Sequence, residues 1–341
     1  MSPNSLFQSL QLFHKLSISL ILFLHHFSCF LTDLQSSKMT FPIVGDNVRN
    51  YEIISVLGGG AFGTVYSCVD VDDRLNQLAI KAMDLSTVTR ENSYKLELMV
   101  LQRVETLSEV EQTRFSKLIG NFIQDSSLGF FVMHKEGECV DEVWMRNKSG
   151  RFSASNVLKI VHCMAHGLRS LHKIGFIHRD CHAGNILFAS RLTPTAPVKI
   201  VDFGIGRRFA NRRGHPIPSP SRDIDFLGCE HCSVNVHVGG IPGPKDDFLS
   251  MVLLAIRMSG IHAISYENSE TNLCQKKSFE SNPAQFLMRC PWLVPVSVAI
   301  IKNDPNRFNY DCVIHAIENA SLFNPSEVIG HCYENGLLRV F

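Results

Sequence analysis

The 341-residue chain has almost no net charge. Lys and Arg number 33 and Asp and Glu number 32, which leaves a formal net charge of +1 at pH 7. A chain with no excess of either sign lacks the electrostatic footprint that nucleic acids or anionic membranes require, so we expect no nucleic-acid partner. Charged residues are also scarce, at 19% against 45% hydrophobic residues, and this balance predicts a globular core. Internal repeats and low-complexity blocks are absent from the sequence.

The cysteines do not follow the spacing of a disulfide framework. All eleven are scattered along the chain, and most lie in apolar runs such as Ser67-Cys68-Val69. Isolated thiols in apolar surroundings are typical of free, buried cysteines in a reducing compartment. We therefore expect a cytoplasmic or nuclear protein.

The first 48 residues are predicted to be an extension that precedes the folded domain. Residues 16–31 are strongly apolar but include His25 and His26, and the run is short of the ~20 apolar residues that span a bilayer. The bulky residues 27–30 make a poor signal-cleavage site. Two interpretations stay open: a dispensable segment with Met39 as the functional start, or a true signal or anchor. The chemistry downstream favours the first, and we expect membrane association only if the segment is a true anchor.

The first part of the chain proper is rich in predicted strands. Strand-forming residues cover 51–56, 64–69, 78–83 and 130–133, and apolar residues at helical spacing predict one helix over residues 90–104. The strands are expected to form an antiparallel sheet.

The rest of the chain is predicted to be mainly helical. Residues 156–172 carry a continuous apolar face, Ser153 or Ser155 can cap the start of this helix, and Gly175 suits its end. Four further segments are predicted: a strand over 198–201, a mobile loop over 207–228, a buried helix over 247–258, and helices with proline breaks from there to residue 341.

This order of elements predicts an α+β fold with two lobes. The small lobe, residues 49–133, contains the antiparallel sheet and one helix, and the larger helical lobe covers residues 134–325. Residues 326–341 are predicted to be a C-terminal tail. A cleft between two such lobes is a common place for a ligand.

A glycine-rich turn joins the first two strands. Gly58, Gly60 and Gly63 are followed by Val65, and glycines allow a backbone to bend tightly and to approach phosphate groups. Taken alone, this pattern also fits a plain hairpin turn. A Rossmann motif is excluded, because in that fold a helix follows the glycines, whereas here a strand follows.

A lysine lies within the apolar third strand. Lys81 follows Ala79 and Ile80, and burying an unpaired ammonium group is costly. Its expected partners are phosphate oxygens of a nucleotide and a carboxylate on the next helix. Glu97 is the candidate for that carboxylate, and Glu91 is the alternative.

The segment from His178 to Asn185 reads H-R-D-C-H-A-G-N, and Asp202-Phe203-Gly204 follows it. In this pattern Asp180 orients the hydroxyl that attacks a γ-phosphate, while Asn185 and Asp202 offer the hard oxygen ligands that Mg²⁺ prefers. Any one of these residues alone would indicate little. The glycine turn, the strand lysine and both motifs in this order predict phosphoryl transfer from ATP.

The chain resembles eukaryotic protein kinases, and within them the casein kinase I group with its tau-tubulin kinase relatives. The resemblance covers residues 50–319 and is carried by the motifs above, by Ser233-Val-Asn-Val-His-Val-Gly239 and by Asp246-Asp247-Phe-Leu-Ser250. Pro291-Trp292 and residues 305–310 fit the same group. It implies a two-lobed, monomeric enzyme that uses ATP and Mg²⁺ to phosphorylate Ser or Thr in proteins.

The resemblance also implies roles for individual residues. Met133 corresponds to the gatekeeper, Glu136 ends the adenine-binding hinge that begins at His134, and Asp247 anchors the catalytic loop. The implied catalytic set is Asp180, Lys81, Asn185 and His182. The implied nucleotide-binding set is Gly58, Gly60, Gly63, Val65, Ala79, Lys81, Glu97, Met133 and Glu136.

The catalytic loop departs from the group at two positions. His182 and Ala183 replace a Lys-Pro pair whose lysine contacts the γ-phosphate. Loss of a charge-assisted hydrogen bond costs about 1.5–3 kcal/mol, or roughly 10–100-fold in rate. Slow catalysis is therefore expected, and a pseudokinase that binds nucleotide as a scaffold is the alternative. A small-molecule phosphotransferase is disfavoured, because such enzymes lack the segment at 233–250.

Four smaller features of the sequence lie outside these motifs. Residues 228–230 replace the group's Gly-Thr run, and Cys229-Glu-His-Cys232 resembles half of a zinc site without a second half. On the helix predicted over residues 156–172, Cys163 is expected to be buried, and His162 and His166 are expected to lie at the surface. Five arginines form a basic loop that either is simply solvated or attracts an acidic or phosphorylated substrate: Arg207, Arg208, Arg212, Arg213 and Arg222.

Overall fold

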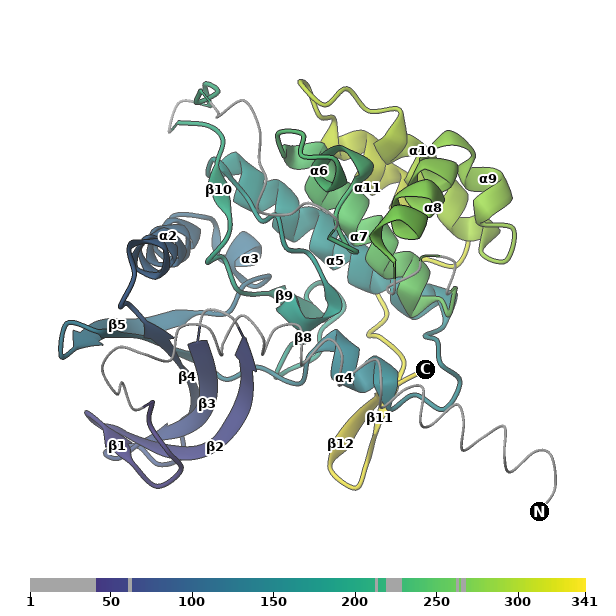
Figure 1. The fold of residues 1–341 in the computed structure, drawn as a ribbon. Helices are drawn as coiled ribbons and strands as arrows, with labels where there is room; N and C mark the ends of the chain where they lie inside the picture. The colour runs from purple at the N-terminus through teal and green to yellow at the C-terminus, as the bar shows by residue number, and fades with distance from the viewer. Residues whose placement is uncertain (1–40, 61–62, 212–213, 219–228, 262–263, 265–267) are drawn as a thin grey trace, which may run out of the picture. The chain divides into compact units, whose positions relative to one another are not determined.

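The computed structural model describes residues 41–341 except 61–62, 212–213, 219–228, 262–263 and 265–267. The chain divides into two compact units, which are drawn in Figure 1. The first unit comprises the chain up to Glu91 together with Gly120–Val132, and the second comprises Asn92–Ile119 and Met133–Phe341. The apolar segment at 16–31 lies outside the described residues. Within the described residues, no helix is long and apolar enough to span a membrane.

The first unit is built on a six-stranded sheet with the strand order β1-β2-β3-β4-β6-β5. Its strands are β1 (Asn47–Val48), β2 (Tyr51–Gly60), β3 (Gly63–Asp70), β4 (Gln77–Asp84), β5 (Leu118–Gln124) and β6 (Leu128–His134). Every second residue of β3 and β4 enters one core, for example Tyr66 and Cys68 from β3 and Ile80 from β4. Phe122 and Phe130 stack in the same core with ring centroids 4.9 Å apart. The predicted antiparallel pairing of the first three strands is confirmed.

The second unit is mainly helical. Its longer helices are α2 (Val88–Val104, whose first residues belong to the first unit), α5 (Ala154–Lys173), α7 (Pro244–Met258), α8 (Ser269–Ser281), α10 (Val294–Ile301) and α11 (Tyr310–Glu318). Its short helices are α3 (Glu109–Gln112), α4 (Val140–Met145), η1 (Ala183–Asn185), α6 (Val234–His237), α9 (Pro283–Phe286) and η2 (Pro291–Leu293). Short strand pairs join β8 (Ile186–Phe188) to β9 (Val198–Ile200) and β7 (Phe176–Ile177) to β10 (Arg207–Arg208).

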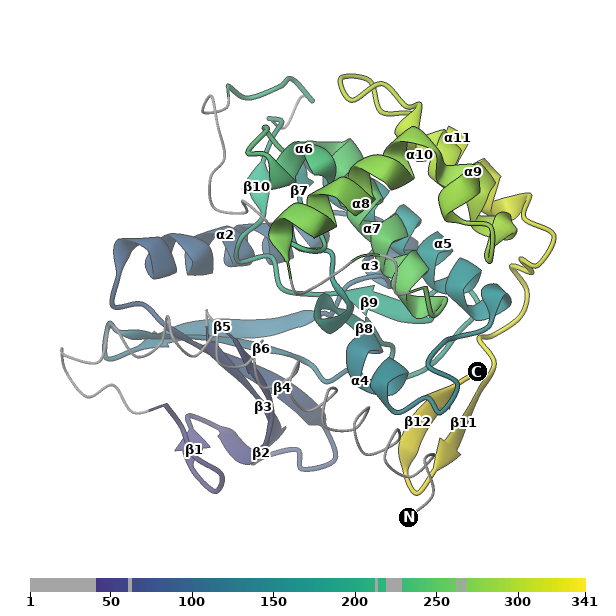
Figure 2. The ribbon, with the colours of Figure 1, turned by 45° about the vertical axis from the view of Figure 1, so that its right-hand side comes forward.

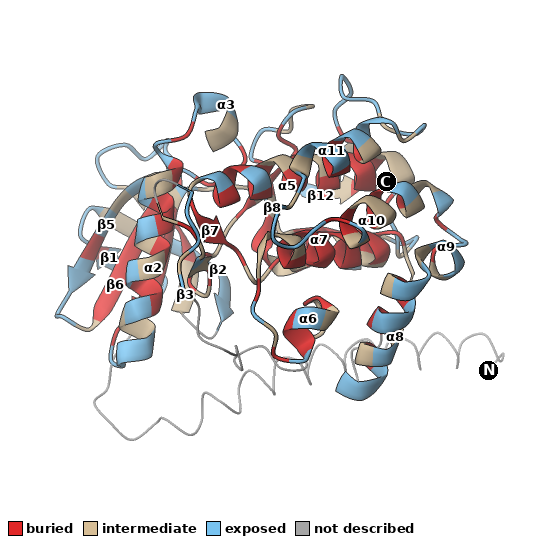
Figure 3. Ribbon diagram, turned by 90° about the horizontal axis from the view of Figure 1, so that it is seen from above, coloured by how far each residue is buried: buried red, intermediate tan, exposed pale blue. Residues whose placement is uncertain are grey.

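Helices α5 and α7 form the centre of this unit, and Figure 3 shows both as largely buried. Helix α5 begins where the Ser153 side chain accepts a hydrogen bond from the Asn156 amide, and it ends just before Gly175, which has a φ of +91°. The predicted apolar face is fully buried, and each such side chain contributes about 1.5–3 kcal/mol. Both predicted helices are therefore confirmed, with Ser153 as the cap of α5.

The C-terminal residues form a β-hairpin, so the prediction of helical segments up to residue 341 was wrong there. Strands β11 (His331–Glu334) and β12 (Leu337–Val340) pair across a turn in which Asn335 and Gly336 have φ values of 52° and 78°. Asn-Gly is the preferred sequence for such a turn, and the signal was available in the sequence. Strand β12 packs against α4, as Figure 2 shows, and Asn147 Nδ2 donates to the Val340 carbonyl at 2.7 Å.

The structure has a short strand where the predicted loop over residues 207–228 begins. Arg207 and Arg208 form strand β10, whose register pairs Arg207 with Ile177. Arg212, Arg213 and Arg222 lie outside the described residues.

Candidate active site

A buried carboxylate on α7 holds the catalytic loop in place. Asp247 Oδ2 accepts a hydrogen bond from the His178 amide at 2.7 Å, and Oδ1 accepts one from the Arg179 amide at 2.8 Å. His172 Nε2 lies 2.8 Å from Oδ2. Burial alone would raise the pKa of Asp247, but these hydrogen bonds and the nearby histidines lower it. The anchoring contact that we expected of Asp247 is therefore present.

His178 supports the same loop from inside. Its ring lies at 0% exposure, with Nε2 3.0 Å from the Val201 carbonyl, and Nδ1 accepts from the Asp180 amide at 3.2 Å. Arg179 has a φ of 72° and donates to the Ile205 carbonyl at 3.2 Å. These contacts orient the carboxylate of Asp180.

Three side chains surround the Asp180 carboxylate. Asn185 Nδ2 donates to Oδ2 at 2.9 Å and to the Asp180 carbonyl at 3.1 Å. His231 Nε2 lies 2.7 Å from Oδ1, and His182 Nε2 lies 3.5 Å from Oδ2. Burial would raise the pKa of Asp180, but the hydrogen bonds and positive charge of His182 and His231 lower it far below its ordinary value. The carboxylate is therefore ionised at neutral pH.

His231 is a site residue that the sequence interpretation missed. It lies in the segment Cys229-Glu-His-Cys232, which was considered only as half of a zinc site. Burial disfavours its protonated form, but the hydrogen bonds with Asp180 and Cys229 raise its pKa to about 9. The imidazolium form therefore pairs with Asp180 at neutral pH. No local pattern could have identified this contact, because 51 positions separate the two residues in the sequence.

His182 replaces the expected lysine and is drawn toward Asp180. Burial lowers the pKa of His182, but the hydrogen bond and charge of Asp180 outweigh this and raise it above its ordinary value. In the neutral ring Nδ1 accepts from the Gly184 amide at 3.1 Å, and protonation of Nδ1 gives up this hydrogen bond. Because Asp180 favours the protonated ring, the residue still offers more positive charge than a solvated histidine, and less than a lysine.

The carboxylates of Asp202 and Glu97 both lie near Gly204. Asp202 has a φ of 64°, and its Oδ1 accepts from the Gly204 amide at 3.3 Å. A Cβ on Gly204 would lie 3.4 Å from Asp202 Oδ1, 3.4 Å from Glu97 Oε2 and 2.7 Å from Ser93 Oγ. Ser93 Oγ donates to the Gly204 carbonyl at 2.7 Å. Ser93 is a second position that the sequence interpretation missed. A side chain at position 204 would displace Ser93 Oγ from this hydrogen bond.

The oxygen atoms available here fit a hard divalent cation. The Asn185 amide nitrogen donates to Asp180, so the oxygen Oδ1 of the same side chain is the atom that could bind a cation, and Asp202 contributes a carboxylate. Asn185 and Asp202 are therefore the residues that would hold Mg²⁺, whose chemistry is to neutralise charge on the phosphate oxygens.

The glycine turn and Lys81 lie in the first unit. Gly58 pairs with Val65 and Gly60 with Gly63 in the β2–β3 hairpin, and the next pairing places Val65 opposite Lys81 on β4. A Cβ on Gly63 would collide with the Ala82 carbonyl, whereas Cβ atoms on Gly58 and Gly60 would meet nothing within 4 Å. Packing against the Ala82 carbonyl thus explains why position 63 is glycine, but it does not explain Gly58 or Gly60. The open space beside the backbone at those two positions suits close approach by a ligand.

Lys81 is 5% exposed and Ala79 is buried on the same strand. Glu97 is 2% exposed and lies on α2 in the second unit. The ion pair between Lys81 and Glu97, with Glu91 as the alternative, stays a prediction.

Two contacts hold the carboxylate of Glu136, the last residue of the predicted adenine-binding hinge. The Glu136 side chain is 3% exposed, with Oε1 3.4 Å from Lys199 Nζ and Oε2 accepting from the Ser190 amide at 3.0 Å. The His134 amide donates to the Lys117 carbonyl at 3.0 Å. Met133 is partly buried at the end of β6. Contact of these residues with adenine stays a prediction.

The segment that follows the predicted activation loop is tied to α7. Ser233 Oγ donates to Asp246 Oδ1 at 2.5 Å, and Asn235 Nδ2 lies 3.3 Å from both carboxylate oxygens of Asp246. The hydrogen bond with Cys232 and burial together raise the pKa of the Cys229 thiol, so it stays protonated. Cys229 and Cys232 belong to no cluster of metal-ligating side chains within the described residues.

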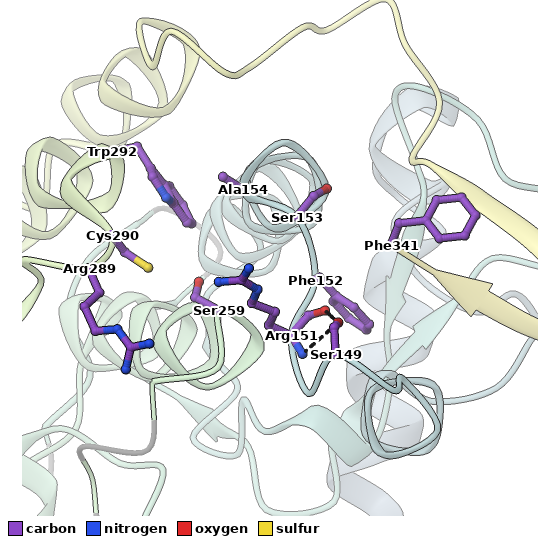
Figure 4. A pocket seen from close by; sticks show the side chains of 10 residues that line it. All are labelled: Ser149, Arg151, Phe152, Ser153, Ala154, Ser259, Arg289, Cys290, Trp292 and Phe341. Atoms are coloured by element: carbon purple, nitrogen blue, oxygen red, sulfur yellow. Dashed lines mark hydrogen bonds between the residues drawn. The ribbon is translucent and has the colours of Figure 1, made fainter.

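A separate pocket of about 350 Å³ lies at the start of α5 (Figure 4). Arg151 and Arg289 contribute its charged side chains and Trp292 its largest aromatic one. None of the motif residues lines it. The active site is therefore assigned to Asp180 and its neighbours on the basis of their chemistry.

Comparison with known proteins identifies the family and the fold of the chain. The family model of the protein kinase domain matches residues 51–280, and the chain belongs to this family. A solved structure, that of vaccinia related kinase 3, superposes with a TM-score of 0.66 over 88% of this chain and 98% of the other, at 14% identity. This likeness confirms the two-lobed kinase fold that the sequence predicts.

Two curated relatives are similar to a large part of the chain. A probable serine/threonine-protein kinase of Dictyostelium discoideum is 27% identical over 61% of this chain and 40% of its own length. A putative casein kinase I of Caenorhabditis elegans is 25% identical over 62% of this chain and 60% of its own length. The chain thus spans less than two thirds of either relative.

Proposed function

We propose that the protein is a serine/threonine kinase of the casein kinase I type that transfers the γ-phosphate of ATP to a hydroxyl group of a protein. The observation that carries the proposal is the Asp180 carboxylate, which is ionised and held by Asn185 while Asp247 fixes its loop. Membership of the protein kinase family and the serine/threonine kinases among its relatives support the same activity.

Each residue has a distinct task in this proposal. Asp180 accepts a hydrogen bond from the substrate hydroxyl and orients it for attack. Lys81 and the glycine turn bind phosphate oxygens, and His182 supplies a partial positive charge next to the transferred group. Phosphoryl transfer depends mainly on positioning and charge stabilisation, so these groups suffice.

The casein kinase I type is supported by two features. The first is the segment from Ser233 to Gly239, which is fixed to α7 through Asp246. The second is the similarity to the nematode putative casein kinase I. Arg207 and Arg208 also suit an acidic or phosphorylated protein substrate. We also propose a cytoplasmic or nuclear location, since the cysteines within the described residues are free thiols. A monomer is proposed from the resemblance to the casein kinase I group.

The direct test is transfer of radiolabelled phosphate from ATP to casein as an acidic substrate, with Mg²⁺ present. Asp180→Asn removes the carboxylate at nearly constant size and should reduce transfer to background. Asp125→Asn is the matched control, because Asp125 is exposed in a turn with a φ of 51°, which asparagine tolerates. The control should retain full activity.

A pseudokinase is the second candidate, and one contact favours it. His231 Nε2 lies 2.7 Å from Asp180 Oδ1, and Asn185 donates to Oδ2, so both carboxylate oxygens already have a protein partner that a substrate hydroxyl would compete with. This candidate predicts nucleotide binding by the wild-type protein together with transfer no greater than that of Asp180→Asn. Transfer that depends on Asp180 would exclude it.

A further inference from the structure

Two histidines of α5 and one glutamate of α11 form a cluster outside the active site. One ring nitrogen of His162, one of His166 and one carboxylate oxygen of Glu318 all lie within 4.8 Å of one another. His162 Nε2 and Glu318 Oε1 are 3.3 Å apart. Two imidazoles and a carboxylate form a common three-residue ligand set for zinc.

We propose that His162, His166 and Glu318 bind a zinc ion that links α5 to α11. His162 and His166 are four positions apart on one helix, so their side chains project from the same face. Tetrahedral zinc with bonds of ~2.0–2.1 Å needs ligand atoms about 3.3 Å apart. The His162–Glu318 separation already has this value, and the separations that involve His166 are at most 4.8 Å. The fourth position would be left for water.

The two helices hold the ligands in register. Helix α11 packs against α5, and both are drawn in Figure 3. Arg169 Nη1 lies 2.9 Å from Asp311 Oδ1, and His172 Nδ1 lies 3.2 Å from Tyr310 Oη. These two contacts and the His162–Glu318 contact follow one another along antiparallel helices. Ligands on packed helices need little rearrangement to bind a metal.

The two imidazole rings lie close together on the same face of α5. Their ring centroids are 4.6 Å apart, with an interplanar angle of 72°. The His162 ring is further positioned by Phe323, with ring centroids 4.7 Å apart.

Two arginines near the cluster are engaged by other groups. Arg169 is paired with Asp311, and Arg114 Nη1 donates to the Val110 carbonyl at 2.8 Å. Glu318 brings a negative charge to the ion itself. Imidazole nitrogens disfavour Mg²⁺ and Ca²⁺, which prefer oxygen ligands, so zinc is the natural occupant.

Zinc titration of the full-length, chelator-stripped protein tests the proposal. The titration is done by calorimetry in excess Mg²⁺, so that the Asn185–Asp202 site does not take zinc. Wild type should bind one equivalent more than the His162→Gln/His166→Gln variant. Glu318→Ala removes a single exposed ligand and should weaken that site at least about tenfold. His215→Gln, a change at an exposed histidine outside the cluster, should bind like wild type.

Two further readouts separate this site from cysteine sites and from misfolding. Cobalt bound here should show the visible absorption of a tetrahedral ion without the charge-transfer band of a thiolate. Free zinc at a hundred times its Kd should raise the folded-to-unfolded ratio about 100-fold in wild type, and much less in Glu318→Ala. Equal stoichiometry and affinity in wild type and Glu318→Ala would overturn the proposal and leave only a His162–Glu318 ion pair. Because Asp180→Asn should bind zinc normally, the outcome is independent of kinase activity.

Discussion

Replacement of His231 by glutamine should remove a pH-dependent part of the protein's stability. Burial opposes protonation of His231, but the hydrogen bonds and charge of Asp180 and Cys229 outweigh it and raise the pKa of His231 from 6.5 to about 9 in the folded protein. A group whose pKa is raised on folding stabilises the protein fully below its unfolded pKa, and this stabilisation is lost as the pH rises through the folded pKa. The window therefore runs from about pH 6.5 to about pH 9.

The magnitude follows from the same two values. At about 1.4 kcal/mol per pH unit, a rise from 6.5 to about 9 corresponds to about 3 kcal/mol. The His231 side chain is 23% exposed, so solvent screening reduces this to about 2–3 kcal/mol. The lowered pKa of Asp180 reflects the same contact and is not added to it. Its own effect on stability appears only in acid, where the carboxylate takes up a proton.

Urea denaturation at about pH 6 and about pH 9.5 measures the effect. Wild type should lose about 2–3 kcal/mol more of its free energy of unfolding between these values than His231→Gln. Comparing the two proteins removes the contributions of cysteines and lysines, which titrate in both. His215→Gln should behave like wild type. Equal pH dependence in wild type and His231→Gln would refute the reasoning, because it would mean that the contact with Asp180 does not hold the imidazolium form.

Two other predictions concern the catalytic loop. His182→Lys should raise phosphate transfer by roughly 10-fold or more, because a permanent charge replaces a partly protonated imidazole; initial rates with labelled ATP would show this, and an unchanged or lower rate would contradict the assigned role. Asp247→Ala should destabilise the second unit by about 3–5 kcal/mol, because it leaves the amides of His178 and Arg179 and the His172 ring without their buried partner. Urea denaturation measures that loss, with Asp125→Asn as the control, and a change below about 1 kcal/mol would argue against an anchoring role.

Much of the fold could be read from local patterns. The apolar face of α5, its cap at Ser153 and its end near Gly175 follow from helical periodicity and capping chemistry, and all three are present. The same holds for strands β2, β3 and β4, whose bounds agree with the predicted ones to within a few residues at their ends. The terminal hairpin differs from the prediction because the helical pattern of the preceding residues does not continue past the Asn335-Gly336 turn, which reverses the chain.

The kinase motifs, their order and the histidine at position 182 can be recognised in the sequence, because they depend on residue type and short spacing. The contacts of His231 with Asp180 and of Glu318 with His162 on another helix appear only once the chain is folded. Such contacts join residues far apart in the chain. They depend on how helices and loops pack, and local periodicity carries no information about that packing.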